Sequence, residues 1–257
     1  IRDGFWLLLV EFVLIYFIQQ GVISWVESLV LIVLYGLYVL YLFKTMKGGH
    51  DINYEEPFTD KDRVSFLSAF MILDLKRMII GNQKLNTKTA WLVFVISSLI
   101  IGFVCYFLVL ACEWLGSETY TVYGFGELQG LGIPLLFVAI VFAAIGSSFP
   151  DTIISYKDAQ KGNYDDAISN AYGSNIFNLC IALGVPLFLF TFLYGPIELT
   201  QEIVSLITNL SLWFFGLTAF SIFLYTRLGG VTRKQALILI ATYVIFILFI
   251  FLLYLDD

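Results

Sequence analysis

The sequence predicts an all-α integral membrane protein with about seven transmembrane helices. Hydrophobic residues make up 60% of the 257-residue chain and aromatic residues 18%, whereas only 13% of the residues are charged. A helix that crosses a bilayer needs about 20 predominantly apolar residues, and seven stretches of the sequence approach or exceed that length. They cover approximately residues 5–20, 22–43, 89–113, 132–156, 165–193, 202–227 and 231–254.

The positions of the positive charges support this number of spans. All 14 Lys and Arg residues fall on one predicted side of the membrane: Arg2, Lys44, Lys47, Lys61, Arg63, Lys76, Arg77, Lys84, Lys88, Lys157, Lys161, Arg227, Arg233 and Lys234. The opposite connections carry carboxylates, at Glu113, Glu118, Glu127, Glu198 and Glu202. Because loops rich in Lys and Arg stay in the cytoplasm, we expect the N-terminal end inside and the C-terminus outside. That arrangement requires an odd number of spans, which seven satisfies.

Two predicted helices occupy residues 1–43. The first is short for a span, and the chain begins at Ile1 without an initiator Met, so we expect the polypeptide to extend further upstream. Glu27 is expected near the outer interface of the membrane. Glu11 lies within the first span, and the sequence offers no explanation for it.

Residues 44–88 form the long polar connection, which the charges place in the cytoplasm. Over residues 58–81, apolar side chains recur at helical spacing and predict an amphipathic helix on the inner membrane face. These side chains are Val64, Leu67, Phe70, Met71 and Leu75. A connecting role for this helix is favoured over a regulatory one.

The remaining residues, 89–257, hold five predicted helices. The outer connection at 117–132 is rich in Gly and Tyr and is expected to form an ordered loop. Cys105, Cys112 and Cys180 all lie within predicted spans, where scattered thiols serve as packing residues more often than in a disulfide or a metal site.

A short polar segment, GSSFPD at residues 146–151, interrupts the fourth predicted span. Pro150 removes a backbone donor and clashes with the preceding turn, and Gly146 makes unwinding less costly. We therefore expect the helix to kink or open here and to free carbonyl groups near Ala144 and Ser147. With the Asp151 carboxylate, these oxygens are ligands that hard cations such as Ca²⁺ and Na⁺ prefer.

A second polar segment, GSNIFN at residues 173–178, lies in the fifth predicted span. Gly173 is expected to loosen the helix, and Ser174 and Asn178 lie one turn apart on the same face with Asn175 beside them. Hydrogen bonding between membrane helices is an alternative role for such residues. Because polar groups at membrane depth are costly and both segments occur together with Asp151, a cation site is favoured.

These two segments also carry a family resemblance. GSSFPDTIISYKDAQKG followed by DDAISNAYGSNIFN resembles the second α-repeat of the calcium/cation antiporter superfamily, and most closely that of the sodium/calcium exchangers. The resemblance covers residues 135–186. It implies the C-terminal part of an inverted-repeat (5+5) cation exchanger, in which 1–43 are the last two helices of the first half and 89–257 are the second half.

The resemblance also implies roles for individual residues. Asp151 takes the acidic position of the family motif and would be the main ligand from this half, in a motif where Ser147 replaces the more usual Thr. Polar positions around the family's ion sites correspond to Ser147, Ser148, Ser174, Asn175 and Asn178. Asn178 takes a position that is Asp in potassium-dependent exchangers, which favours potassium independence here.

The expected function is therefore secondary active antiport of Na⁺ against Ca²⁺ by alternating access. Asp151, together with a carboxylate from a first α-repeat that is missing from this chain, would bind either one Ca²⁺ or several Na⁺. The alternatives are a proton- or K⁺-coupled antiporter of the same superfamily, or a cation channel or passive membrane subunit. An enzyme is not expected, because the sequence shows no intramembrane His and no nucleophile beside a base.

We expect no resident cofactor, only the transported Ca²⁺ and Na⁺, and no nucleic-acid partner. The plasma membrane is favoured over an organelle membrane.

Overall fold

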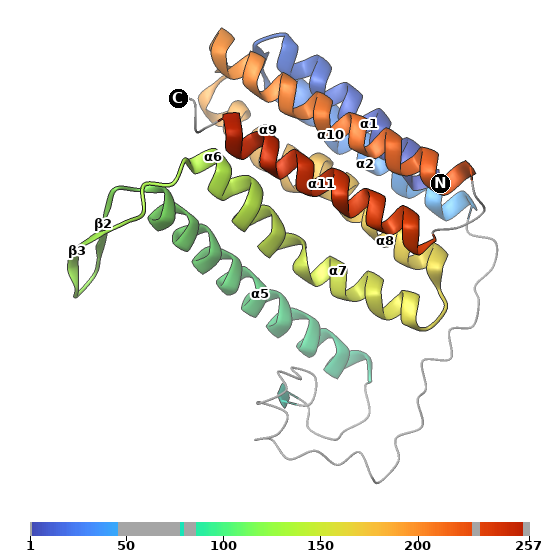
Figure 1. Cartoon of the computed structure of the whole chain (residues 1–257). Coiled ribbons are helices and arrows are strands. Elements are labelled where there is room, and N and C mark those ends of the chain that lie inside the picture. Colours follow the sequence, from blue (N-terminus) through green and yellow to red (C-terminus); the bar gives the residue numbers. More distant parts are fainter. Residues whose placement is uncertain (1, 46–77, 80–85, 228–231, 254–257) are drawn as a thin grey trace. The chain divides into compact units, whose positions relative to one another are not determined.

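The computed structural model describes residues 2–45, 78–79, 86–227 and 232–253, and these residues are almost entirely helical (Figure 1). They belong to two compact units, the first made of the residues up to 45 and from 148 onward, the second of those from 78 to 147. The predicted amphipathic helix over 58–81 lies outside the described residues except for 78–79, and so does the C-terminal end from residue 254.

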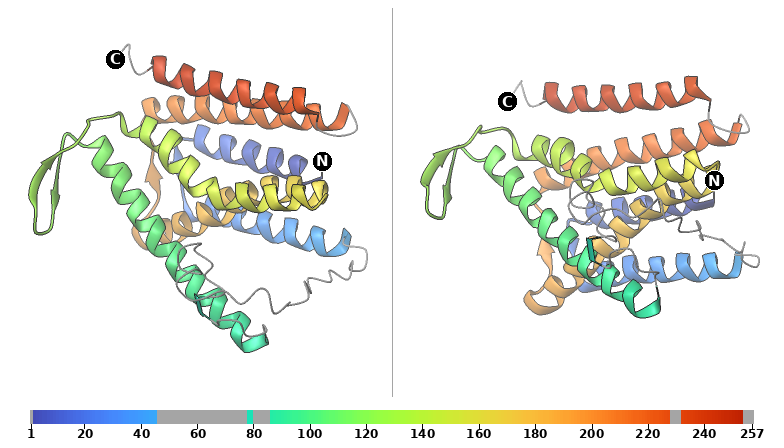
Figure 2. Two further views of the ribbon diagram at one scale, coloured as in Figure 1. Left: turned by 60° about the horizontal axis from the view of Figure 1, so that its bottom comes forward. Right: turned by 90° about the horizontal axis from the view of Figure 1, so that it is seen from below.

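The first unit is a bundle of long helices. It contains α1 (Arg2–Gln19), α2 (Trp25–Thr45), α8 (Tyr164–Phe177), α9 (Gly184–Tyr194), α10 (Gln201–Arg227), α11 (Arg233–Leu253) and α7 (Ala144–Gln160) from residue 148 onward. Helix α1 packs along α10 and also contacts α8, and α2 packs along α9 (Figures 1 and 2). Segments far apart in the sequence are therefore neighbours in this bundle.

Apolar side chains from four helical segments and one short π-helix form the core of the first unit. The buried members are Leu7, Val10, Tyr38, Tyr172, Ile176, Cys180 and Ile222. Gly4 brings α1 close to α10, since a Cβ at this position would lie 2.7 Å from Cγ1 of Ile222. The α1–α10 contact therefore depends on a residue without a side chain.

A small antiparallel pair of strands joins two helix connections at one end of the first unit. Strand β1 (Val22–Ile23) pairs with β4 (Ile197–Glu198), with Val22 opposite Glu198. Gly21 precedes β1 with φ +73°, a conformation that favours glycine. The α1–α2 and α9–α10 connections therefore lie at the same end of the bundle, as the predicted topology requires.

The second unit is built on α5 (Thr87–Gly116), the longest α-helix of the described chain. Its N-terminus is closed by a capping box, in which Asn86 and Thr89 satisfy each other's backbone N–H groups. Strands β2 (Thr119–Val122) and β3 (Gly126–Gln129) then form a hairpin. This hairpin confirms that the 117–132 connection is ordered, although its side of the membrane stays a prediction.

After the hairpin, the chain continues through α6 (Leu135–Val138) and a five-residue π-helix, η2 (Ala139–Ala143), into α7. A second π-helix, η3 (Asn178–Ala182), joins α8 to α9. In both places, the backbone pairing changes from the α-helical to the π-helical pattern.

The predicted all-α membrane fold is confirmed. Six helical stretches of the described chain are long and apolar enough to cross a membrane: Trp25–Thr45, Thr87–Gly116, Ala139–Gln160, Tyr164–Tyr194, Gln201–Thr226 and Arg233–Phe251. Helix α1 corresponds to the remaining predicted span. It has 18 residues and carries three charged side chains, Arg2, Asp3 and Glu11, yet it packs along α10 and against α8.

Candidate cation-binding site

The first polar segment lies within α7, and the helix does not open there. Helix α7 runs without interruption over Ala144–Gln160, with Pro150 in its interior. The expected opening of the helix at Gly146–Pro150 is therefore wrong, and a kink there stays a prediction. The irregularity lies a few residues earlier, in the π-helix η2, a type of distortion that is frequent at functional sites.

The carbonyl groups near this segment differ from expectation. The Ala144 carbonyl accepts a hydrogen bond from Ser147 Oγ at 3.1 Å, so it is not a free ligand in this conformation. Pro150 has no N–H, so it cannot donate to the carbonyl of Gly146, four residues earlier. The ligand roles of Ala144 and Ser147 stay predictions.

The second polar segment lies at the end of α8. The helix continues through Gly173, so the expected loosening at this residue is wrong, and the change of pairing comes at Asn178, where η3 begins. The Asn178 carbonyl accepts from the Leu183 N–H at 2.9 Å, five residues later.

The polar side chains of this segment are turned away from the core. Asn175 and Asn178 are exposed and Ser174 is half-buried. Asn175 Nδ2 donates to the Ala171 carbonyl at 2.8 Å, and Ser174 Oγ donates to the same carbonyl at 3.3 Å. Asn175 therefore uses its amino group locally and leaves its Oδ1 as an available ligand.

A residue that the sequence patterns did not single out connects α8, the helix that carries most of the second segment, to α7. Asn170, on α8, donates from Nδ2 to the Asp151 carbonyl at 3.1 Å and to Ser155 Oγ at 3.0 Å, both on α7. Asn170 lies one turn before Ser174 and therefore on the same face of α8. This face, which carries candidate ligands, is hydrogen-bonded to α7 at Asp151. Asn170 could have been found from the sequence by its position about one turn before the GSNIFN segment, on the same predicted helix.

Asp151 itself is half-buried, and its carboxylate forms no hydrogen bond or ion pair with the residues that the structure describes. Within the same described ranges, no three or more His, Cys, Asp or Glu side chains gather as a metal cluster. Among the candidate ligands named above, Asp151 therefore supplies a carboxylate and the others supply neutral oxygens. Ser148, one turn before Asp151 on α7, accepts at its carbonyl from Thr152 Oγ1 at 2.9 Å.

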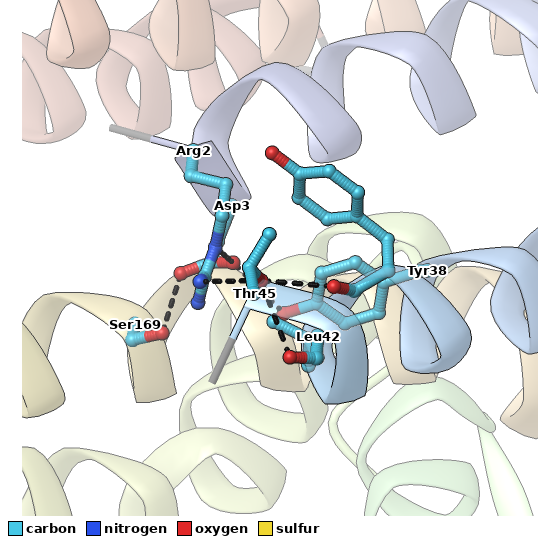
Figure 3. Close-up of polar contacts among 7 residues, drawn as sticks. Arg2, Asp3, Tyr38, Leu42, Thr45 and Ser169 are labelled. Atoms are coloured by element: carbon cyan, nitrogen blue, oxygen red, sulfur yellow. Dashed lines mark hydrogen bonds and ion pairs between the residues drawn. The ribbon is translucent and has the colours of Figure 1, made fainter. Parts of the chain in front are cut away.

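A polar cluster fixes the other side of α8. Asp3, in the first turn of α1, is only 5% exposed. Its carboxylate accepts from Ser169 Oγ on α8, from Tyr38 OH on α2 at 3.2 Å, and from Arg2 Nε at 3.1 Å (Figure 3). Arg2 also donates to Thr45 Oγ1 at 3.2 Å. Ser169 and Asn170 are adjacent, so α8 is held toward α1 and α2 by one residue and toward α7 by the next.

The fold and these two segments define a class: a multi-pass integral membrane protein with oxygen-rich polar positions on two connected helices. Residues 89–252, more than half of the chain and including both segments, match the family described as sodium/calcium exchanger protein. The chain belongs to this family, within the calcium/cation antiporters.

Several curated relatives carry exchanger names. The chain is 31% identical over 156 residues to a probable sodium/potassium/calcium exchanger of Drosophila melanogaster. The matched region covers 60% of this chain and 23% of that protein. It is 33% identical over 144 residues to human sodium/potassium/calcium exchanger 5, covering 52% of this chain and 27% of that protein. The chain therefore spans about a quarter of the length of these relatives. No solved structure matches it.

Proposed function

We propose that this chain forms part of a secondary active antiporter that exchanges Na⁺ for Ca²⁺ by alternating access. The observation that carries the proposal is a hydrogen bond between α8 and the first polar segment: Asn170, one turn before Ser174, donates to the Asp151 carbonyl at 3.1 Å. This hydrogen bond from the Asn170 side-chain amide supports a role of α7 and α8 in holding oxygen ligands in place. Membership of the exchanger family favours cation exchange over a purely structural role for these groups.

Within this proposal, Asp151 is the charged ligand of this chain. Hydroxyl and amide oxygens assist it, from Ser147, Ser148, Ser174, Asn175 and Asn178, together with the Ala144 carbonyl. Ca²⁺ takes about six to eight oxygen ligands, and Asp151 alone does not neutralise a divalent ion. We therefore propose that a first α-repeat of inverted orientation supplies a second carboxylate, either in the same polypeptide or in a partner chain.

Coupling then follows from competition for the same oxygens. One Ca²⁺ or several Na⁺ can neutralise the carboxylates, but both sets cannot be bound together. A neutralised site crosses between the two membrane faces at much lower cost than an empty, charged one. This difference prevents empty return and makes the exchange obligatory.

The test is sodium-gradient-driven Ca²⁺ uptake into vesicles that contain the whole protein to which this sequence belongs. We expect uptake to collapse when the Na⁺ gradient is removed, and to be abolished by Asp151→Asn while membrane insertion is retained. Asp158→Asn removes the same charge about two turns later on α7 and should leave uptake near the wild-type rate. Near-normal exchange by Asp151→Asn would contradict the proposed role of this residue.

Potassium coupling is the second candidate, because the relatives named above are called sodium/potassium/calcium exchangers. The same vesicles distinguish it: uptake that requires K⁺ at a fixed Na⁺ gradient identifies potassium coupling. If Asn178 underlies potassium independence, Asn178→Asp should introduce a K⁺ requirement, and unchanged K⁺ sensitivity counts against that role. Uptake driven by a pH gradient without Na⁺ identifies proton coupling, and flux without any counter-ion identifies a channel.

A further inference from the structure

One carboxylate in the first unit is left without a role by the proposed exchange mechanism. Glu11 lies near the middle of α1, which packs along α10 and against α8. Its Oε1 accepts a hydrogen bond from Thr218 Oγ1 on α10 at 2.8 Å. Its Oε2 is buried and has no hydrogen-bond partner among the residues that the structure describes.

The other carboxylates of α1 and α2 are satisfied differently. Asp3 accepts from Arg2, Tyr38 and Ser169. Glu27 accepts from the Ser24 backbone N–H at 2.8 Å and from the Ser24 hydroxyl, at the start of α2. On these two helices, Glu11 is thus distinguished by a buried oxygen with no partner.

No positive charge compensates Glu11 in the described part of the chain. The Arg2–Asp3 ion pair lies about two turns away on α1 and is already paired. The titratable groups that neighbouring elements contribute to the adjacent core are phenols and one thiol: Tyr35, Tyr38, Tyr172, Cys180 and Tyr225. An ionised carboxylate in this position therefore has one hydroxyl donor and no counter-ion, which is a costly arrangement inside a membrane bundle.

A proton suits this site better than a metal cation. Na⁺ and Ca²⁺ need several oxygens, whereas among the described residues a single hydroxyl, that of Thr218, lies within hydrogen-bond distance of Glu11. A proton needs one oxygen, and Oε2 accepts no hydrogen bond from the described residues. With the proton on Oε2, Oε1 is a carbonyl oxygen that still accepts from Thr218, so the observed hydrogen bond is compatible with the neutral acid.

We propose that the Glu11 carboxyl group, held by Thr218, is a proton-binding site inside the helix bundle, separate from the α-repeat, and that its occupancy modulates exchange. Binding adds a proton from the aqueous phase to Oε2 and removes the negative charge. No covalent bond to another group forms or breaks.

A polar path leads from this site to the second polar segment. The Thr218 carbonyl accepts from Ser221 Oγ at 2.8 Å, and Ser221 Oγ lies 2.8 Å from Tyr172 OH on α8. Tyr172 directly precedes the GSNIFN segment. Ionisation of Glu11 disfavours the α1–α10 contact and thereby acts on the helix that carries Ser174, Asn175 and Asn178.

The first readout is infrared spectroscopy of the whole protein in lipid vesicles, titrated with pH. We expect a carbonyl band of a protonated carboxylic acid that disappears on raising the pH. Glu11→Gln should remove this band, and Glu27→Gln, whose amide oxygen can still accept from the Ser24 N–H, should retain it. A wild-type protein without such a band, or a band that survives in Glu11→Gln, overturns the proposal.

Thr218→Val provides a second variant if Glu11→Gln fails to fold. It is close in shape and removes the hydroxyl that donates to Oε1, so we expect the acid band to move to higher frequency. A band at unchanged frequency in Thr218→Val contradicts the assignment to Glu11.

The second readout is the pH profile of Ca²⁺ uptake, and only this part rests on the proposed exchange function. A single titrating group changes the rate by at most about tenfold per pH unit, and Glu11→Gln should remove that dependence while Glu27→Gln keeps it. Identical profiles in the wild type and Glu11→Gln overturn the modulatory role. A titrating band in a protein without Ca²⁺ uptake supports the proton site and rejects the proposed exchange function.

Discussion

Asn170 shows how one side chain can set the position of others. Its amide donates twice to α7, to the Asp151 carbonyl and to Ser155 Oγ, although Asn170 itself is not among the candidate cation ligands. The backbone at Asp151 is therefore held close to α8, one turn before the candidate ligands Ser174 and Asn175.

We expect Asn170→Leu to lower the free energy of unfolding by about 1–3 kcal/mol, because both donors are lost and their acceptors stay half-buried. The same variant should raise the Ca²⁺ concentration for half-maximal uptake more than it lowers the maximal rate. Thermal unfolding in lipid or detergent and the Ca²⁺ dependence of uptake measure the two effects. Ser155→Ala removes only one of the two hydrogen bonds of Asn170. Equal effects of Asn170→Leu and Ser155→Ala would therefore contradict a contribution from the second hydrogen bond, to the Asp151 carbonyl.

Asp3 has a comparable position on the opposite side of α8. Asp3→Asn keeps the shape of the side chain but replaces one acceptor oxygen by a donor, which then faces either the Tyr38 hydroxyl at Oδ1 or the Ser169 hydroxyl at Oδ2. We expect a loss of about 1–3 kcal/mol in stability, measured by thermal unfolding. Arg2→Gln should cost less, since the Arg2 side chain is 40% exposed. A larger loss for Arg2→Gln would show that the ion pair, rather than the buried acceptor, holds the cluster.

At the level of elements, the two polar segments are associated with changes of helix type and not with breaks. The π-helix η2 ends three residues before Gly146, and η3 begins at Asn178. A π-helix lets the chain absorb an extra residue while every other backbone group keeps a partner. This satisfies the requirement for paired backbone groups in a membrane at lower cost than the open helix that Pro150 and Gly146 had predicted.

The contact between α1 and α10 gives a prediction at the same scale. Gly4→Ala places a Cβ 2.7 Å from Cγ1 of Ile222, so one of the two helices must shift. Overpacking of this kind costs about 1–3 kcal/mol, which thermal unfolding can measure. Gly36→Ala in α2 is the matched control, because a Cβ there meets nothing within 4 Å. If both alanine variants are equally stable, α1 and α10 are not closely packed at this point.

At the scale of the whole molecule, the charge distribution predicts an orientation. We propose that residues 44–88 face the cytoplasm of the cell and that the C-terminus is outside, in the plasma membrane. An epitope fused after Asp257 should bind antibody on intact cells, and one inserted between Gly48 and Gly49 should bind only after permeabilisation. The reverse pattern would overturn the orientation, and labelling confined to an internal membrane would overturn the plasma-membrane assignment.

The sequence by itself determined the fold class and the location of the candidate site along the chain. The transmembrane helices can be predicted from the length of the apolar stretches. Unpaired backbone groups are costly in lipid, and an α-helix pairs them all within one segment. The polar segments around Asp151 and Asn178 are visible for the same reason, since hydroxyl, amide and carboxylate side chains stand out against an apolar background. Where the sequence failed, at Gly146 and Gly173, local helix-breaking tendencies were outweighed by the need to keep backbone groups paired.

Only the tertiary structure decided which side chains meet. Ser169 and Asp3 are 166 residues apart, and Thr218 and Glu11 are 207 apart, and no periodicity in the sequence specifies those pairs. Helical spacing assigns a residue to one face of its helix. Which helix packs against that face depends on the order of the helices in the bundle and on how far each is shifted along its axis. These are set by contacts such as Gly4 against Ile222, where steric fit between distant segments fixes the distance of approach.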